Sequence, residues 1–189
     1  MHITQTREQV ILLTLRLASE KGLASVSLSD IAKAAHITKA SLYSHFSSKE
    51  EIIDGMYRLM DTFKGNDMIG LSGSAEEVLQ KTVRHWVAAY TTVPMRWAYR
   101  IVFQMRFTDQ RAAKRAKAIL NMFQAQTQAV LETLSDTGRL DIPDLDLATT
   151  LFSCAAASFV DEENITEKDE DDWALSRMVQ QFCRVFAPR

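Results

Sequence analysis

Apolar residues recur three and four positions apart along most of this chain, which is the spacing that places them on one face of an α-helix. Alternation of β-branched and polar residues never lasts long enough to predict a strand. The length of 189 residues and the hydrophobic content of 47% are sufficient for a buried core. The pattern therefore predicts an all-α fold.

The first third of the chain predicts four helices, two of them short. The first helix covers about 6–21. The sequence Ser27-Leu28-Ser29-Asp30 is a capping box for a short second helix, and Thr38 is placed to cap a third that ends near His45. Two short helices separated by a tight turn form a helix-turn-helix. A longer helix of about 48–64 follows.

A glycine-rich segment separates this region from the rest of the chain. Three of the six glycines lie between residues 65 and 73, which predicts a domain boundary there. We expect a helix-turn-helix domain at 1–64 and a larger helical domain at 65–189. The helices expected in the larger domain cover about 74–92, 94–107, 109–135, 144–160 and 167–187. Further capping boxes are expected at Thr6–Gln9, Ser48–Glu51, Ser74–Glu77 and Thr166–Asp169.

Charge is distributed unevenly along the sequence. The formal net charge of -2 excludes a protein that coats nucleic acid through its bulk charge. Residues 31–49, however, carry three lysines, two histidines and no acidic residue, whereas residues 161–172 carry eight acidic residues and one lysine. Any contact with nucleic acid is therefore expected at the basic segment inside the helix-turn-helix.

The second helix of such a motif enters the major groove of DNA while the first braces it. Leu42 and Phe46, four residues apart, are expected to face inward. The other side chains are short donors, one cation and one phenol, which suit base edges and phosphates: Thr38, Lys39, Ser41, Tyr43, Ser44 and His45. Lys49 follows at the start of the next helix, where backbone amides attract a phosphate. These residues predict double-stranded DNA as a partner.

This segment resembles the DNA-binding signature of the TetR (tetracycline repressor) family. The similarity covers about residues 7–60, and the highly specific part is the string Leu-Tyr-x-His-Phe-x-x-Lys that runs from Leu42 to Lys49. His36 departs from the family pattern, which usually has glycine in this turn. The resemblance implies phosphate contacts for Tyr43, His45 and Lys49, and further DNA contacts for Ser27, Thr38, Lys39 and Ser41.

Several of these residues also have a possible role without DNA. Tyr43 is compatible with a partly buried packing residue, and His45 with a surface or capping histidine. Ser27 is first of all a helix cap. Lys39, which we expect to contact a base, is otherwise a solvated lysine.

For the larger domain the resemblance implies a dimer and a ligand pocket. In TetR-like proteins the last two long helices pair with their copies in a four-helix interface, which here corresponds to about 144–160 and 167–187. The small residues 155–157, all alanine, permit close helix approach. The last helix offers an apolar stripe of Trp173, Met178, Phe182 and Phe186. A two-fold dimer predicts a palindromic operator.

The middle helices are rich in aromatic residues and methionine, which is typical of a pocket for an apolar or aromatic small-molecule effector. Arg96 and Arg100, four residues apart, are an alternative site for an anionic effector. An ordinary core, and a solvated face for the basic residues between Arg96 and Lys117, are the other interpretations. The candidate ligand-binding residues are Trp86, Tyr90, Trp97, Arg100, Phe103, Gln104, Met122 and Phe123.

Other classes of function have little support in the sequence. The four histidines lack paired metal-ligand spacing, and we find neither a glycine-rich phosphate loop nor a nucleophile motif. We therefore expect no enzyme, no metal and no cofactor. Cys154 and Cys183 lie in apolar stretches and are expected to be buried thiols. We expect no membrane span and no secretory signal, and hence a cytoplasmic protein.

The function that the sequence predicts is a transcription repressor that an effector releases from its operator. The alternative is a dimeric DNA-binding regulator without a small-molecule ligand, controlled by a protein partner or by its abundance.

Overall fold

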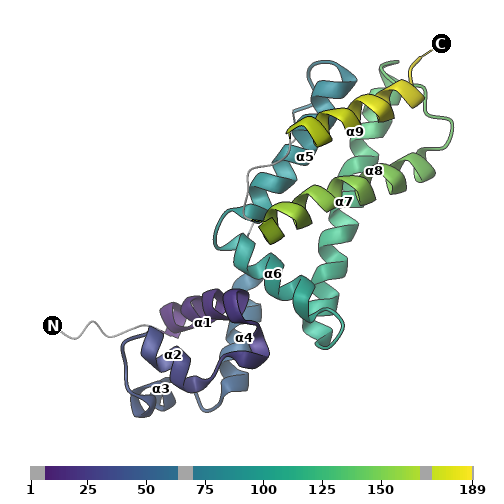
Figure 1. Ribbon diagram of the computed structural model, residues 1–189. Coiled ribbons are helices and arrows are strands. Elements are labelled where there is room, and N and C mark those ends of the chain that lie inside the picture. The colour runs from purple at the N-terminus through teal and green to yellow at the C-terminus, as the bar shows by residue number, and fades with distance from the viewer. Residues whose placement is uncertain (1–6, 64–69, 167–171, 189) are drawn as a thin grey trace. The chain divides into compact units, whose positions relative to one another are not determined.

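The computed structural model describes residues 7–63, 70–166 and 172–188, and all regular structure in these ranges is helical (Figure 1). The fold class expected from the sequence is confirmed. The helices of the first part are α1 (Arg7–Lys21), the 3-10 turn η1 (Leu23–Ser25), α2 (Leu28–Ala34), α3 (Lys39–His45) and α4 (Lys49–Met60). They are followed by α5 (Ala75–Thr91), α6 (Met95–Met105), α7 (Gln110–Asp136), α8 (Leu145–Thr166) and α9 (Asp172–Val185).

Side chains at the helix starts accept hydrogen bonds from backbone amides that have no partner within the helix. The box predicted at Ser48 is half formed, because Ser48 Oγ accepts from the amide of Glu51 at 3.1 Å while the Glu51 carboxylate bonds to Ser47. The boxes expected at 6–9 and 166–169 lie partly outside the described residues. Complete capping boxes join Ser27 to Asp30 and Ser74 to Glu77, as predicted.

The ends of two helices differ from the predicted ones by four residues or more. α4 ends at Met60 rather than near residue 64, and a turn follows in which the amide of Thr62 donates to the carbonyl of Leu59. α8 continues to Thr166 rather than ending near residue 160. The buried face of α8 continues with it, because Asn164 is also buried and its side-chain amide bonds to backbone carbonyls.

The first compact unit contains α1 to α4, α6 and the first turns of α7. α1 packs against both α4 and α6. Where α1 packs against α4, a Cβ atom on Gly55 would lie 2.6 Å from Cδ1 of Ile11, so a larger residue at this position would require the Ile11 side chain to move. The almost fully buried core residues of this unit include Val10, Leu15, Ile31, Leu42, Ile52, Met56 and Ile101.

The second compact unit contains α5, α8, α9 and α7 from Lys117 onward. α5 packs against α8 and α9. The buried amide of Asn164 donates to the backbone carbonyl of Tyr90 at 3.2 Å and to that of Val160 at 2.8 Å, which ties α8 to α5. The core of this unit includes Leu79, Trp86, Phe123, Leu131 and Phe152.

These compact units do not follow a single cut in the sequence. Residues 93–116, which include α6, pack with the first unit rather than with the second. The buried face of α6, formed by residues such as Ala98, Tyr99 and Ile101, is apolar and carries no signal of which helix it will cover. The division into a DNA-binding domain at 1–64 and a second domain at 65–189 stays a prediction. In the structure, α6 packs with the first compact unit.

The turn between α2 and α3 holds one residue in the left-handed region. His36 has φ 54°, and the amides of His36 and Ile37 donate to the carbonyls of Lys33 and Ala32. A left-handed conformation costs a residue with a Cβ about 1–2 kcal/mol. Glycine at this position would avoid that cost.

We expect His36→Gly to raise the free energy of unfolding by up to about 1 kcal/mol, because the strain relieved exceeds the backbone entropy that glycine loses on folding. His36→Val should lower it by about 1–2 kcal/mol, because a β-branched residue tolerates a positive φ poorly. The His36 side chain is exposed, so neither change removes core packing. Urea unfolding measures both effects, and a valine variant as stable as the unchanged chain would contradict this turn geometry.

Candidate DNA-binding interface

The inner face of α3 anchors this helix to the first unit. Leu42 and Phe46 are 1% and 2% exposed, as the sequence predicts. Ala32 and Ala35, near the end of α2, are also buried, and α2 packs against α3. The helix-turn-helix is therefore formed, with one side of α3 in the core and the other toward solvent.

The outer face of α3 carries the side chains expected to contact DNA. Tyr43 is 56% exposed, and Lys39 and Ser44 are exposed as well. Ser41 and His45 are half-buried. The exposure of Tyr43 favours a contact with DNA over the alternative interpretation as a partly buried packing residue. A cation, a phenol and hydroxyls on one accessible helix face suit phosphates and base edges.

Hydrogen bonds within the protein determine whether each candidate hydroxyl still has a proton to donate to DNA. Thr38 Oγ1 accepts from the amide of Ser41 at 3.1 Å, so its own proton remains available for donation. Ser44 Oγ donates its proton to the Ser41 carbonyl at 2.7 Å. Ser27 Oγ donates to Asp30 Oδ2 at 2.6 Å, and the bonds from Ser27 lower the pKa of Asp30. Thr38 is therefore better prepared to donate to DNA than Ser27 or Ser44.

Lys49, the first residue of α4, is bonded within the protein. Its Nζ donates to the carbonyl of Leu23 at 3.3 Å, which ties α4 to η1. An ammonium group has three donors, so this bond leaves capacity for a phosphate oxygen. The phosphate contact of Lys49 stays a prediction.

Arg7 of α1 also belongs to this site, although no motif of the sequence points to it. Nη1 donates to the backbone carbonyl of His45, and Nη2 donates to Glu51 Oε1 at 2.6 Å. The guanidinium also lies 4.4 Å from the centre of the Phe46 ring. These partners are up to 44 residues away in the chain, so no local pattern could reveal the contact.

Glu51 extends the contact of Arg7 to the segment between α3 and α4. Its Oε2 accepts from the amide and the hydroxyl of Ser47 at 2.7 and 2.9 Å. Hydrogen bonds from Arg7 first, and then from Ser47, lower the pKa of Glu51 from 4.5 to about 2. The carboxylate therefore stays charged at neutral pH.

A second arginine contact holds α4 from the start of α7. Arg111 donates to Glu50 at 2.8 Å and to Asp54 at 2.5 Å, both on α4. It also pairs with Asp109 at 2.7 Å. Hydrogen bonds to Asp109, and to a smaller extent to Glu50 and Asp54, raise the pKa of Arg111 above its usual value. One turn later, Arg115 bonds to α4 as well.

Arg115 forms two hydrogen bonds to Asp61, at 2.9 and 2.5 Å, and donates to the backbone carbonyl of Tyr57 at 3.1 Å. The guanidinium groups of Arg111 and Arg115 each lie 4.8 Å from the centre of the Tyr57 ring. Burial raises the pKa of Tyr57 to about 12, so the phenol stays neutral. Arg111 and Arg115 thus form contacts within the protein. The interpretation of the basic residues between Arg96 and Lys117 as a solvated face therefore does not hold for these two.

Four of the candidate ligand residues come together in the second unit. Trp86 stacks on Phe123 with 4.3 Å between ring centres, and Tyr90 meets Phe123 edge-on at 5.5 Å. The Tyr90 hydroxyl lies 3.9 Å from Met122 Sδ. Trp86 Nε1 donates to Gln126 Oε1 at 2.6 Å, so the indole nitrogen of this aromatic cluster has a partner.

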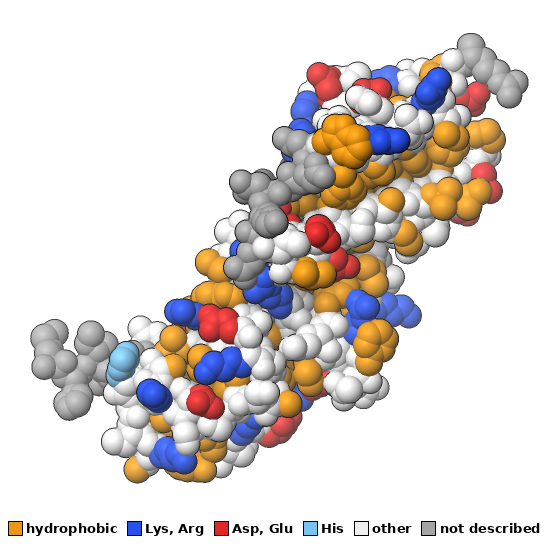
Figure 2. All heavy atoms as spheres, in the orientation of Figure 1, with side chains coloured by type: hydrophobic (Ala, Val, Ile, Leu, Met, Phe, Trp, Pro, Cys, Tyr) orange, Lys and Arg blue, Asp and Glu red, His pale blue; other side chains and the backbone are white. Residues whose placement is uncertain are grey.

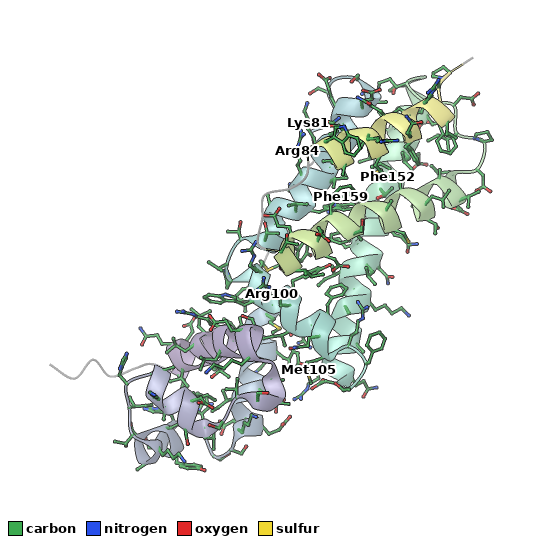
Figure 3. The ribbon with its side chains drawn as sticks, viewed as in Figure 1. Lys81, Arg84, Arg100, Met105, Phe152 and Phe159 are labelled. Carbon is green, nitrogen blue, oxygen red and sulfur yellow. The ribbon has the colours of Figure 1, made fainter. Side chains whose placement is uncertain are left out.

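The other four candidates lie on α6, in the first unit. Phe103 stacks on Tyr99 with 4.2 Å between ring centres. Trp97 and Arg100, the latter labelled in Figure 3, are half-buried. Gln104 is exposed and lies beside Gly22 at the end of α1, where its Nε2 would be 3.4 Å from an added Cβ. The eight residues are therefore divided between two compact units.

Large apolar side chains remain exposed along α8 and α9 (Figure 2). Leu147 and Leu151 of α8 are 55% and 56% exposed, and Trp173 and Val185 of α9 are exposed to a greater extent. Figure 2 shows hydrophobic side chains gathered over these two helices. We call these four residues the apolar face.

The apolar face differs from the stripes predicted for these helices. Ala156 is fully buried within its own chain rather than presented for close helix approach, and Ala155 and Ala157 are half-buried. On α9, Phe182 packs against Phe152 of α8, labelled in Figure 3, with 4.9 Å between ring centres. Of the predicted stripe of α9, Trp173 is exposed, whereas Met178, Phe182 and Phe186 are half-buried.

The two cysteines differ from each other. Cys183 is buried as expected, and burial raises the pKa of its thiol to about 11. Cys154 is exposed, so the expectation of a buried thiol was wrong there. Position 154 follows Leu151 by three residues on α8, and the apolar residues around it in sequence face both sides of the helix.

Residues 7–63, 70–166 and 172–188 hold no group of three or more His, Cys, Asp or Glu side chains placed to bind a metal ion. No helix in the same ranges has the length and apolar character needed to cross a membrane.

Two family models match this chain. The model for bacterial regulatory proteins of the tetR family matches residues 11–56, and the model for the C-terminal domain of AefR-like transcriptional repressors matches residues 77–188. AcrR of Shigella flexneri, an HTH-type transcriptional regulator, is 36% identical over 58 residues, which cover 31% of this chain and 27% of AcrR. The HTH-type repressor KstR2 of Mycolicibacterium smegmatis is 28% identical over 99 residues, covering 52% of this chain and 48% of KstR2. The matches thus span less than half of the length of these relatives.

Solved structures match over almost the whole chain. PfmR of Thermus thermophilus, a TetR-family regulator, gives a TM-score of 0.65 at 21% identity and covers 95% of this chain and 96% of PfmR. FadR of Bacillus subtilis, solved with stearoyl-CoA, gives 0.60 at 17% identity, with coverage of 94% and 97%. At these identities the likeness shows the fold.

The anchored α3 with its polar outer face defines a protein of the helix-turn-helix class. Because the C-terminal family model alone matches more than half of the residues, the chain belongs to the TetR family of bacterial transcription regulators. The resemblance noted in the sequence is confirmed. The relatives and solved structures named above are transcription regulators rather than enzymes.

Proposed function

We propose that this protein is a sequence-specific repressor that binds a palindromic operator as a homodimer and is released by a small-molecule effector. The observation that carries the DNA-binding part is the outer face of α3, where Lys39 and Tyr43 are exposed on a helix whose inner face is anchored. A helix held in this way enters a major groove without losing its own packing. Because the net charge is -2, affinity depends on this local face.

The proposed contacts follow from the chemistry of each side chain. Tyr43, His45 and Lys49 contact phosphates, and Lys39 donates to a base edge. Thr38 donates its available hydroxyl proton. Ser27 and Ser44 contribute less, because their hydroxyl protons are already donated within the protein. Ser41 is half-buried and therefore reaches DNA least directly.

The homodimer is proposed to form through α8 and α9. Leu147 and Leu151 are four residues apart and therefore lie on the same side of α8. Exposed apolar area is unfavourable by about 25 cal/mol per Å². Pairing of the apolar face with that of a second copy removes it from water. A two-fold dimer then presents two copies of α3, which suits a palindrome.

The effector is proposed to bind at the aromatic cluster of the second unit, formed by Trp86, Tyr90, Met122 and Phe123. Apolar rings with a few polar groups are typical of ligand pockets, and they favour an apolar or aromatic compound. The α6 residues Trp97, Arg100, Phe103 and Gln104 remain proposed ligand residues. Because FadR was solved with stearoyl-CoA, long-chain acyl-CoA belongs among the first compounds to test.

The close stacking of Trp86 on Phe123 also favours the second candidate function, a regulator without a small-molecule ligand. Rings 4.3 Å apart pack as densely as an ordinary core. Such a regulator would bind the same kind of operator and would be controlled by a protein partner or by abundance. Ligand screening separates the two candidates.

Release from DNA is proposed to act through α4. A ligand shifts a conformational equilibrium only by its difference in affinity for the two states. α4 follows α3 directly in the chain, and Arg111 and Arg115 bind it to the start of α7. α7 is one continuous helix whose later turns carry Met122 and Phe123. A ligand at these residues could therefore alter the position of α4 through α7.

Selection of the purified protein against a library of random duplexes tests the DNA-binding proposal. We expect enrichment of one palindrome, and weaker binding at higher salt because condensed counterions compete. Tyr43→Ala should weaken binding to that palindrome about tenfold, because a hydrogen bond to a charged phosphate is lost. Phe107→Ala, which removes an exposed aromatic ring from the segment after α6, should leave binding unchanged. No enrichment with a folded dimer would contradict the proposal.

The proposed dimer predicts that Leu151→Glu yields a monomer at micromolar concentration, because each protomer would bury an unpaired carboxylate in the interface. Leu120→Glu, on α7 and 42% exposed, is the matched control and should remain dimeric. Sedimentation velocity measures both. A dimeric Leu151→Glu protein would place the interface elsewhere.

The effector proposal predicts that some apolar or aromatic compound raises the melting temperature, because a ligand that binds only the folded state stabilises it by mass action. The same compound should weaken operator binding. Phe123→Leu should reduce the shift in melting temperature, whereas Phe107→Leu should preserve it. Absence of any stabilising compound favours the regulator without a ligand, and equal operator affinity with and without a saturating compound contradicts release through α4.

A further inference from the structure

We propose that Arg7 is a positioning residue for DNA recognition, which sets the orientation of α3 by binding the end of this helix to the start of α4. The inference rests on the proposed DNA-binding function. Arg7 donates to the carbonyl of His45, the last residue of α3, and to the carboxylate of Glu51 in the first turn of α4. No residue of the predicted DNA contacts has this role.

The short length of α3 makes its position depend on contacts with the rest of the unit. An isolated helix of seven residues is marginal in water, so its position comes from tertiary contacts. Thr38 caps the first turn by accepting from the amide of Ser41. At the opposite end, the guanidinium of Arg7 satisfies a terminal carbonyl and places a positive charge at the negative end of the helix dipole.

Glu51 carries the contact onward to the segment that links the two helices. Its second oxygen accepts from the amide and hydroxyl of Ser47, while Arg7 lies against the ring of Phe46. Arg7 and the Glu51 carboxylate together thus contact residues 45, 46 and 47. We call this arrangement the Arg7 clamp.

Two other roles for Arg7 make different predictions. A purely stabilising ion pair is weak here, because the side chains of Arg7 and Glu51 are 49% and 32% exposed and surface pairs contribute about 0.2–1 kcal/mol. A direct phosphate contact would make the acidic Glu51 unfavourable for binding, since its charge repels DNA. The sign of the Glu51→Gln effect therefore separates positioning from both roles.

The experiment measures binding of Arg7→Gln, Arg7→Lys and Glu51→Gln dimers to the selected palindrome and to a random duplex over a range of salt concentrations. Arg16→Gln and Glu20→Gln are matched controls, because Arg16 and Glu20 form an exposed ion pair on the same helix α1, 2.9 Å apart. Hydrogen exchange at the amide of Ser47, measured on the free protein, reports whether the Arg7 clamp has opened.

We expect Arg7→Gln and Glu51→Gln to weaken binding to the palindrome about tenfold and to leave binding to the random duplex within about twofold. Arg7→Lys should be intermediate, because an ammonium keeps the charge and lacks the planar fork. The amide of Ser47 should exchange faster in the Glu51→Gln protein. Both control variants should bind like the unchanged chain.

The proposal is overturned if Glu51→Gln binds the palindrome as tightly as the unchanged chain or more tightly. It is also overturned if Arg7→Gln lowers the salt slope by about 0.9 for each protomer, which is the signature of a lost phosphate contact. Failure of the DNA-binding function itself looks different, since the unchanged chain would then show no preference for any duplex.

Discussion

Burial of Leu42 and Phe46 is the interaction on which the DNA-binding face depends. α3 has too few residues to be stable alone, so these two side chains hold it in place and thereby expose its opposite side. The left-handed backbone of His36 gives the turn that brings α2 and α3 together. The outer face, with Tyr43 toward solvent, is thus a consequence of packing on the inner face.

Arginine and lysine have different tasks in this chain. Arg7, Arg111 and Arg115 form hydrogen bonds with acidic side chains of α4 and the turn after it, and their planar guanidinium groups bind several acceptors at once. Their charges are therefore largely neutralised inside the first unit. Lys39 is exposed on α3. A regulator with net charge -2 is in this way able to keep a local basic face while using its arginines to hold helices together.

Local signals in the sequence predicted local structure well. The capping boxes at Ser27 and Ser74 are confirmed, since each involves residues three apart in the chain. The end of α8 was predicted wrongly because residues 161–164 are acidic or polar and do not continue the apolar spacing of the preceding turns. The exposure of Cys154 was predicted wrongly because the small and apolar residues around it give little contrast between the faces of the helix. The specific contacts proposed for DNA and ligand remain predictions.

The sequence by itself determined the all-α class, the positions of the helix-turn-helix and its inward residues, and the family. Those properties follow from spacing, capping and a specific string, all of which lie within a few residues of one another. Only the tertiary structure decided that α6 packs with the first unit, that Arg7 reaches Glu51, and that the candidate ligand residues divide between two units. These depend on which helices meet, and an apolar or charged helix face does not encode its partner in its own periodicity.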